Sequence, residues 1–404
     1  MDVRRTALYE ALRMELIGVQ DVTDELIYDR IDRVLYKESR KQHLTNEEKL
    51  KYRQILFFAV RELDILSYIM LDEDVTEIMV NGPDCIYIEK NGQIEAYPEG
   101  FTTEEMLSDV IQKIASAVNR RVNEATPMVD ARLPDGSRVN VALPPVSLNG
   151  PVVTIRRFPK EPMSMETLVR IGSLTREAAE YLRTLVECGY NIFISGGTGA
   201  GKTTFLGALA EYIPASDRVV TIEDSAELRL RKVRNLIRLE SRPATLEGEY
   251  EVTIRDLIRN ALRMRPDRLI VGEIRSGEAL DMLSAMNTGH DGSLSTGHAN
   301  SAADMLSRIE TMVLMGMDLP LAAVRAQIAS GIDIMVHLGR LRDRSRRVLG
   351  IYEVLGVTNG EVELCPLFEF KEEGTHEGRI EGSLVKTGHS LTRTEKLIQR
   401  AGRL

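Results

Sequence analysis

The pattern of apolar and polar positions divides the chain into three parts with different periods. Over the first sixty or so residues, apolar side chains recur at the spacing of a helix that buries one face. A second helix follows Thr45, whose hydroxyl is placed to cap residues 46–48. We predict a small helical bundle over residues 1–62 and interpret it as an appendage or partner-docking module without chemistry of its own. The apolar positions of its clearest helix are Ile27, Ile31, Val34 and Leu35.

The second part, residues 63–158, alternates apolar and polar side chains at a period of two, which is typical of half-buried strands. Asn91-Gly92 is the pair that a tight hairpin turn requires. We predict a small α/β domain with an antiparallel sheet, followed by a proline-containing linker over residues 159–167. The predicted elements are strands at 76–81 and 85–89, a helix at 103–118, and strands at 138–141 and 152–156.

The third part, residues 168–370, alternates short apolar strands with helices, which indicates a mostly parallel sheet covered on both faces. A helix beginning at Thr253 carries apolar residues on one face and arginines largely on the other. Residues 371–404 are charged and rich in glycine, and we expect them to be loosely ordered up to a short terminal helix. The predicted strands are 191–195, 218–222, 268–272 and 292–296.

Composition narrows the class of protein. The net charge of −9, the aromatic content of 5% and the absence of tryptophan argue against nucleic-acid binding. The three cysteines lie far apart without a CxxC pair, so neither a zinc site nor a disulfide framework is predicted. No apolar stretch approaches the ~20 residues needed to span a bilayer, and no signal-peptide core follows the N-terminus. We expect a cytoplasmic protein without a transmembrane segment, which reaches a membrane only through partners.

A phosphate-binding loop follows the first strand of the third part. The spacing GxxxxGK[ST] lies between a predicted strand and a predicted helix over 203–212, which is the context that this motif requires. Glycines let the backbone curl so that successive N–H groups point at a β-phosphate. Lys202 can reach the β- and γ-oxygens and Thr203 can offer its hydroxyl to Mg²⁺, so we predict a site for ATP and Mg²⁺. The loop comprises Gly196, Gly197, Thr198, Gly199, Ala200, Gly201, Lys202 and Thr203.

Acidic side chains end two further predicted strands. Hydrolysis needs a group that orients the attacking water, and Glu273 is our candidate base, the alternative being an ordinary strand-end glutamate. Gly272 stands where the usual pattern has an aspartate. Glu223 and Asp224 end an earlier strand, where they could steer the metal or its waters, or could equally be helix N-caps.

The segment 288–300 holds two histidines and an aspartate among glycines and hydroxyl residues. A metal site is one interpretation, but the ligand spacing is long and no third ligand is obvious. The glycines and hydroxyls better suit a strand that runs beside a phosphate. There, a neutral imidazole could donate one hydrogen bond to the γ-phosphate and report its loss.

With these four segments in order, the chain closely resembles the ATPases of the type II/type IV secretion superfamily, from about Ile65 to Val354. Within that superfamily it most resembles the CpaF-type ATPases of tight-adherence (Tad) pilus systems. Two stretches, 261–268 and 285–293, are near-verbatim for the CpaF branch. The motifs that carry the resemblance are the Walker A motif at 196–204, which extends to Thr204, the Asp box at 221–224, the atypical Walker B motif at 271–273 and the His box at 288–300.

The resemblance implies a RecA-like P-loop domain preceded by a PAS-like α/β domain, assembled as a homo-hexameric ring that uses ATP and Mg²⁺. It implies partners in an inner-membrane pilus or secretion platform and a position at the inner face of the cell membrane. Glu273 would be the catalytic glutamate and His298 the γ-phosphate sensor. Arg138 and Arg156 match the arginines that close on the nucleotide from the smaller domain, with Arg132 and Arg157 as close alternatives. Without the resemblance, each arginine would be interpreted as a solvated strand residue.

Two other classes of function stay open at this point. RecA-like rings also move nucleic acids, and a scaffold could bind ATP without turning it over. Glu273 and His298 argue against the scaffold, since a pure binder needs neither. Ser225 stands where many relatives have proline, and the basic runs 229–234 and 340–347 are either solvated faces or, as we slightly favour, subunit interfaces.

Overall fold

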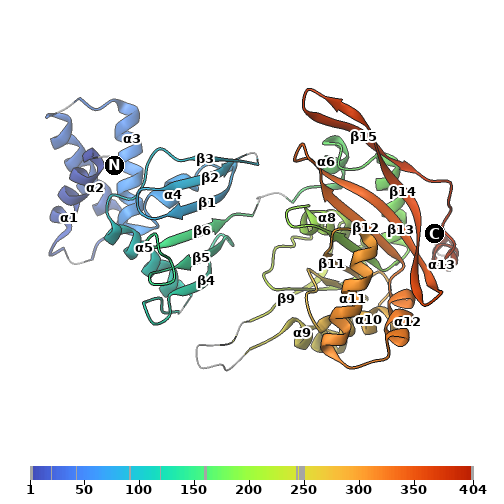
Figure 1. The fold of residues 1–404 in the computed structure, drawn as a ribbon. Coiled ribbons are helices and arrows are strands. Elements are labelled where there is room, and N and C mark those ends of the chain that lie inside the picture. The colour runs from blue at the N-terminus through green and yellow to red at the C-terminus, as the bar shows by residue number, and fades with distance from the viewer. Residues whose placement is uncertain are drawn as a thin grey trace. The chain divides into compact units, whose positions relative to one another are not determined.

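The computed structural model describes residues 3–19, 21–41, 43–90, 92–118, 120–158, 162–242, 244 and 251–401. The chain forms two compact units, Met1–Lys160 and Glu161–Leu404, which are drawn in Figure 1. The division falls inside the segment predicted as a linker. Asn91 of the predicted hairpin turn and residues 159–161 of that segment lie outside the described residues.

The first unit begins with a helical bundle. Thr23 caps the second helix, and Thr45 forms a reciprocal capping box with Glu48 at the start of the third, as its position in the sequence predicts. The apolar positions at helical spacing, including Ile27 and Ile31, are fully buried in the core of the bundle. The helices are α1 (Val3–Leu16), α2 (Asp24–Ser39), α3 (Asn46–Arg61) and the short α4 (Ile65–Ile69).

A six-stranded sheet completes the first unit, in the order β3-β2-β1-β6-β5-β4 with antiparallel pairing throughout. Its apolar face packs on α5 (Glu104–Ala117). The sequence analysis did not predict β3, whose four residues are all exposed, or β4, of which only Val129 is buried. The strands are β1 (Val75–Asn81), β2 (Ile86–Lys90), β3 (Gln93–Ala96), β4 (Met128–Arg132), β5 (Arg138–Ala142) and β6 (Val152–Arg156).

The second unit is built on a nine-stranded sheet in the order β15-β14-β13-β12-β7-β11-β10-β8-β9. The six strands from β12 to β9 run parallel, as predicted, and β7 lies centrally between β11 and β12. The parallel strands are β7 (Ile192–Gly196), β8 (Arg218–Glu223), β9 (Asn235–Glu240), β10 (Arg268–Val271), β11 (Leu294–His298) and β12 (Ile334–Arg340).

Helices cover both faces of this sheet, and successive strand residues point into two separate cores. Ile192 and Ile194 of β7 belong to one core, whereas Phe193 between them belongs to the other. The first core is covered by α6 (Met165–Arg170), α7 (Arg176–Glu187) and α8 (Lys202–Ala210). The second is covered by α9 (Ile254–Ala261), α10 (Glu278–Asn287), α11 (Ala302–Gly316) and α12 (Leu321–Gly331).

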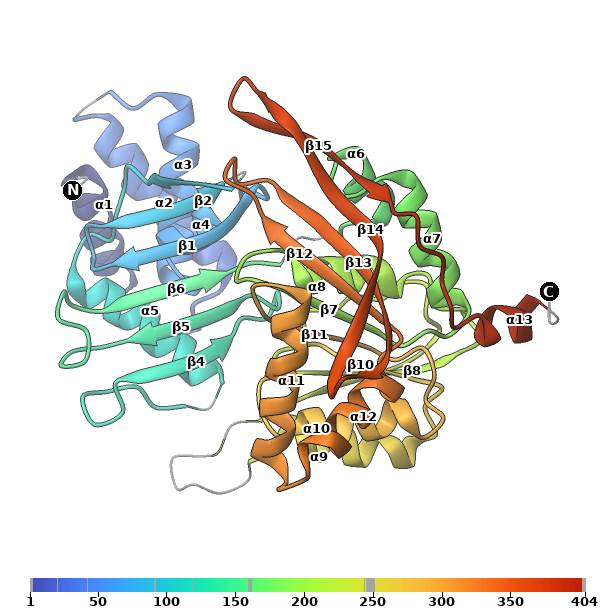
Figure 2. The same ribbon diagram turned by 45° about the vertical axis from the view of Figure 1, so that its right-hand side comes forward.

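The expectation of a loosely ordered tail after residue 370 is wrong. An antiparallel extension made of β13 (Arg346–Thr358), β14 (Glu361–His376) and β15 (Arg379–Lys386) continues the sheet beyond β12. Figure 2 shows β15 along the outer edge of this sheet. The charged and glycine-rich composition hides the strand because only Ile380 and Leu384 of β15 are buried apolar positions. The short terminal helix is confirmed as α13 (Glu395–Ala401).

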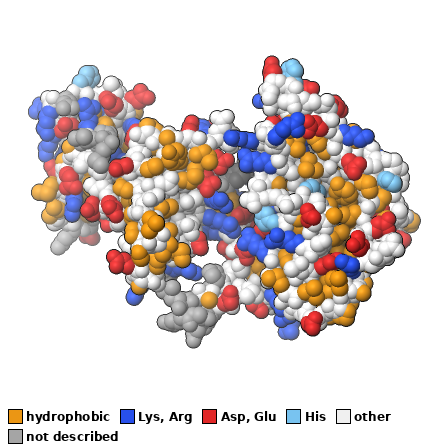
Figure 3. Space-filling view, viewed as in Figure 1, with side chains coloured by type: hydrophobic (Ala, Val, Ile, Leu, Met, Phe, Trp, Pro, Cys, Tyr) orange, Lys and Arg blue, Asp and Glu red, His pale blue; other side chains and the backbone are white. Residues whose placement is uncertain are grey.

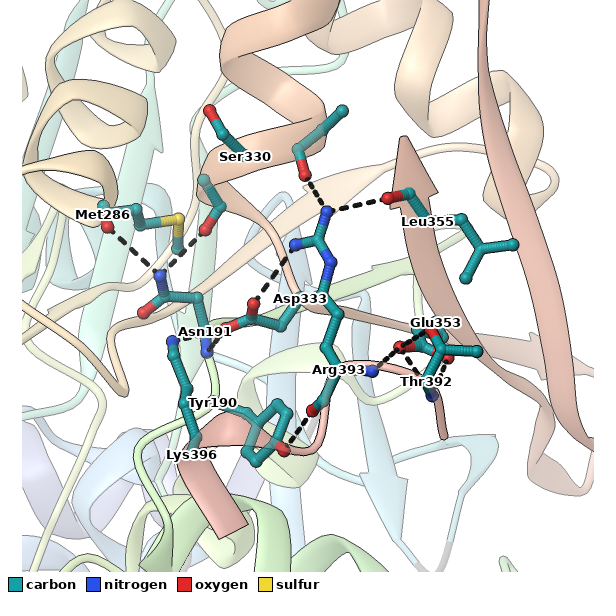
Figure 4. Close-up of polar contacts among 12 residues, drawn as sticks. Tyr190, Asn191, Met286, Ser330, Asp333, Glu353, Leu355, Thr392, Arg393 and Lys396 are labelled. Atoms are coloured by element: carbon teal, nitrogen blue, oxygen red, sulfur yellow. Dashed lines mark hydrogen bonds and ion pairs between the residues drawn. The ribbon is translucent and has the colours of Figure 1, made fainter. Parts of the chain in front are cut away.

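The segment before α13 is held by buried carboxylates, in an arrangement that we call the C-terminal clamp (Figure 4). Glu353 is fully buried and accepts hydrogen bonds from Thr392 N, Thr392 Oγ1 and Arg393 N. Asp333 accepts from Lys396 Nζ at 2.7 Å and from the backbone N–H of Asn191 at 2.8 Å. Because Asn191 directly precedes β7, the clamp ties the end of the described chain to the central strand.

Candidate nucleotide site

The phosphate-binding loop runs from the end of β7 at Gly196 to the start of α8 at Lys202. Gly199 and Gly201 have φ values of 71° and 90°, in the region that side chains disfavour. A Cβ atom at Gly196 would lie 2.5 Å from the carbonyl oxygen of Leu338, so only glycine fits there. The loop therefore curls over the N-terminus of α8, where backbone N–H groups are free of helix partners.

The side chain of Lys202 is buried, and its hydrogen-bond acceptors among the described residues are two backbone carbonyls and an imidazole. Its Nζ donates to the carbonyl oxygens of Gly196 at 3.2 Å and Gly197 at 3.3 Å, and lies 3.0 Å from Nδ1 of His298. Burial lowers the pKa of Lys202 from its ordinary value, although nearby Glu273 opposes this shift. A buried cation that contacts only neutral acceptors is suited to receive an anion.

His298 joins Lys202 to Glu273. The parallel register of β11 with β7 sets His298 directly beside Gly196. Since an ammonium group can only donate, Nδ1 of His298 accepts, which places the imidazole proton on Nε2, 2.8 Å from Glu273 Oε1. Burial lowers the pKa of His298, and the charges of Lys202 and Arg275 lower it further, against the opposing effect of Glu273. The lowered pKa favours a neutral imidazole, the form in which the sequence analysis expects His298 to donate a hydrogen bond to the γ-phosphate.

Glu273 has a second neighbour that the sequence interpretation missed. Arg275 donates from Nη2 at 2.8 Å and from Nε at 3.1 Å to Glu273 Oε2, while its Nη1 lies 3.2 Å from Asp224 Oδ2. The only signal in the sequence was a basic residue two positions after the acid, on a loop that leaves a parallel strand.

Glu223 and Asp224 are not helix N-caps, because residues 224–234 form bends and irregular backbone. Glu223 is buried, and its Oε2 accepts from the N–H groups of Glu227 at 2.8 Å and Leu228 at 3.0 Å. Burial raises the pKa of Glu223, and its Oε1 has no hydrogen-bond partner among the described residues. A Cβ atom at Gly272 would lie 2.9 Å from Glu223 Cγ, so Glu223 fills the space that the usual aspartate would need.

The metal interpretation of segment 288–300 finds no support. Among the described residues, no group of three or more His, Cys, Asp or Glu side chains could hold a metal ion. His290 Nδ1 lies 3.2 Å from the carbonyl oxygen of Ala285, and Asp291 pairs with Lys396 at 2.7 Å. Of the two histidines, only His298 lies at the phosphate loop.

The basic run 340–347 is engaged inside the second unit. Arg346 donates from Nε to the carbonyl oxygen of Gly199 at 2.9 Å, so it touches the phosphate loop itself. Arg347 donates to the carbonyl oxygens of Gly172, Ile380 and Gly382, and Arg342 pairs with Glu372. These arginines therefore contact groups of their own unit, and their role at subunit interfaces stays a prediction. Acidic and basic side chains are interspersed on both units in Figure 3.

Three arginines of the first unit form a row across its sheet. Arg132 of β4 pairs in register with Arg138 of β5, which in turn pairs with Arg156 of β6. Residues paired in this way share one face, where like charges cost stability. Arg156 also lies 3.2 Å from Glu77 on β1. Arg157 instead donates to the backbone carbonyls of residues 70, 72 and 75, and it thereby stabilises the first unit.

The residues present fit a nucleoside triphosphate and a divalent cation. The curled loop and Lys202 suit phosphate oxygens, and Thr203, partly buried in the first turn of α8, is placed to offer its hydroxyl to a cation. Thr204 is exposed and lines a cavity of about 90 Å³ between α8 and β13. A larger cavity of about 610 Å³, lined by Thr198, Arg275 and His298, opens beside the loop.

Comparison with known proteins places the chain in a family. Residues 62–383 match the family model described as "Type II/IV secretion system protein". A putative conjugal transfer protein of Mycobacterium tuberculosis is 33% identical over 326 residues, which is 79% of this chain and 92% of the relative. The probable conjugal transfer protein TrbB of Sinorhizobium fredii is 34% identical over 316 residues, which is 77% of this chain and 93% of the relative.

The fold is that of RecA-like P-loop ATPases. The solved structure titled "Crystal Structure of the Pilus Retraction Motor PilT and Bound ADP" is similar with a TM-score of 0.51 and 19% sequence identity. The similarity covers 84% of this chain and 88% of that one. Among the described residues, no single helix is both long and apolar enough to cross a bilayer.

Proposed function

This chain belongs to the type II/IV secretion ATPase family, and from that premise we propose that it hydrolyses ATP to drive a secretion or pilus machine. The observation that carries the proposal is the contact chain from Lys202 through His298 to Glu273. It joins a phosphate-binding cation to a carboxylate through a neutral imidazole. A domain that only bound the nucleotide would need Lys202 but would have no use for a carboxylate held in this way.

The residues act as follows in the proposed reaction. Backbone N–H groups of the loop and of α8 hold the β-phosphate, and Lys202 exchanges its carbonyl acceptors for β- and γ-oxygens. Glu273 accepts a proton from a water whose oxygen forms a bond to the γ-phosphorus, while the bond from that phosphorus to the bridging oxygen breaks. His298 donates a hydrogen bond from Nε2 to the γ-phosphate and keeps its proton. Mg²⁺, held by the Thr203 hydroxyl with Asp224 and Glu223 near its waters, would neutralise phosphate charge.

Arg138 and Arg156 are our proposed arginine fingers. They lie on one face of the first unit with Arg132, and this clustering of cations supports a role toward an anion. A guanidinium that meets the γ-phosphate from another domain couples hydrolysis to domain movement.

The narrower proposal is a CpaF-type ATPase that assembles a Tad pilus as a homo-hexamer, docked on platform proteins at the inner face of the cell membrane. The two near-verbatim stretches, 261–268 and 285–293, support this branch. A second candidate is a motor of a conjugation system, because two relatives are named as conjugal transfer proteins. The net charge of −9 argues against direct contact of this chain with DNA.

The test is phosphate release by the purified chain with ATP and Mg²⁺ under multiple turnover. Lys202→Ala should weaken nucleotide binding and abolish release, and Glu273→Gln should retain binding while stopping release. If Lys202→Ala releases phosphate at the wild-type rate, the assignment of the phosphate loop as the nucleotide site is wrong. Stimulation by single-stranded DNA would favour the nucleic-acid motor over the pilus motor.

A further inference from the structure

One arginine outside the four motifs connects two of them. Arg275 lies two residues beyond Glu273 and reaches back with its side chain to Glu273 and across to Asp224. It also lines the same cavity as Thr198 and His298. Its guanidinium therefore lies at the edge of the proposed phosphate site, between the Asp box and the Walker B motif.

The geometry of this contact restricts how the Glu273 carboxylate can rotate. Two N–H groups of one planar guanidinium, Nε and Nη2, converge on the same oxygen, Oε2. The other oxygen, Oε1, then faces Nε2 of His298 at 2.8 Å. The far side of the guanidinium is anchored by Asp224 Oδ2 at 3.2 Å. A carboxylate held in this way keeps one oxygen on the guanidinium and presents the other beside His298, on the side of the phosphate loop.

The side chain of Arg275 is not needed to hold its own loop. Glu278 Oε1 accepts hydrogen bonds from the backbone N–H groups of both Arg275 and Ser276 and so fixes the path of the chain after Glu273. The Arg275 side chain is 61% exposed, whereas that of Glu273 is 17% exposed. Loss of the guanidinium should therefore spare the fold but release the carboxylate.

We propose that Arg275 is a positioning residue, which orients Glu273 so that Oε1 takes the proton from the attacking water. The inference rests on the proposed ATP hydrolysis and adds a residue to that site. Misplacement of a reacting group by about 1 Å costs on the order of 10²-fold in rate. We therefore expect a loss of kcat of about this size in Arg275→Gln, with the KM for ATP and the affinity for ADP unchanged.

The experiment compares the steady-state kinetics of Arg275→Gln, Arg275→Lys and Arg275→Ala with a matched control, Arg183→Gln. Arg183 is also exposed and also pairs with a glutamate, Glu187 at 2.7 Å, but it lies on α7. Arg275→Lys should not restore kcat, because an ammonium cannot place two converging donors on one oxygen in this geometry. Added methylguanidinium should raise the kcat of Arg275→Ala and leave that of Glu273→Gln unchanged. The control should match the wild type.

The inference is overturned by wild-type kcat in Arg275→Gln, by full activity in Arg275→Lys, or by a KM that rises while kcat is unchanged. A fall in kcat that methylguanidinium cannot reverse, together with a lower melting temperature, would assign Arg275 a merely structural role. If the wild-type chain itself releases no phosphate, the proposed function fails, whereas active wild type with active Arg275→Gln refutes only the positioning role.

Discussion

Removing the side chain of Arg393 should weaken the C-terminal clamp and lower the stability of the second unit. Arg393 donates from Nη2 to the carbonyl oxygens of Ala329 at 2.6 Å and Leu355 at 2.9 Å, and its Nη1 lies 3.4 Å from Asp333 Oδ1. The Asp333 side chain is only 7% exposed. In Arg393→Ala, this carboxylate loses the guanidinium and keeps Lys396, and two carbonyl oxygens lose a charged donor.

The magnitude follows from burial. Breaking a buried ion pair costs about 3–5 kcal/mol. We take the low end, about 3 kcal/mol, because Lys396 still pairs with Asp333 at 2.7 Å and the Arg393 side chain is 28% exposed. For a unit of this size, each kcal/mol shifts the melting temperature by about 2–4 °C, so the expected fall is about 6–12 °C.

The assay is thermal unfolding of the full chain, with hydrogen exchange at residues 192–196 as a local readout of β7. Exchange should speed up there, because Asp333 also accepts from Asn191, directly before the strand. Arg183→Ala, which removes a solvated pair on α7, is the control and should change stability by less than about 1 kcal/mol. If Arg393→Ala melts like this control and β7 exchanges at the wild-type rate, the clamp contributes no stability and our reasoning is refuted.

Two further predictions concern the site. Arg138→Ala or Arg156→Ala should spare ATP binding but lower kcat by as much as ~10³–10⁵-fold, the range for arginine fingers. An unchanged kcat would exclude that arginine as a finger. Arg157→Ala should instead lower the melting temperature. The pKa of His298 is lower in the folded chain than its unfolded value near 6.5. Below that pH the unfolded state binds more protons than the folded state, so the free energy of unfolding decreases as the pH is lowered. His298→Gln should reduce this loss of stability below about pH 6.5, as measured by urea unfolding at each pH. An equal slope in both chains would contradict it.

Much of the site was predictable because it depends on residues close in sequence. The phosphate loop needs glycines at set positions between a strand and a helix, and Gly199 and Gly201 take the positive φ values that this requires. The parallel strands were predictable from continuous runs of apolar residues. Thr45 and Thr253 cap the helices that follow them. Each of these features follows from local backbone chemistry.

Contacts between segments that are distant along the chain could not be predicted from the sequence. The role of Glu223 depends on which strand lies beside β8, because Gly272, directly after the neighbouring strand β10, leaves room for its side chain. Arg275 gained significance only once Asp224 and Glu273 were brought to the same edge of the sheet. β15 has too few apolar positions to be predicted as a strand, and it forms one because it pairs with β14.

The sequence by itself predicted the phosphate loop and the parallel sheet and singled out Lys202, Glu273 and His298 as candidates, since periodicity and motif spacing are properties of short segments. Tertiary structure alone decided that His298 bridges the other two, that three arginines share one face of a sheet, and that the C-terminal segment is clamped. Strand order and register bring together side chains far apart in the chain, and no pattern within a single segment encodes which strands will be neighbours.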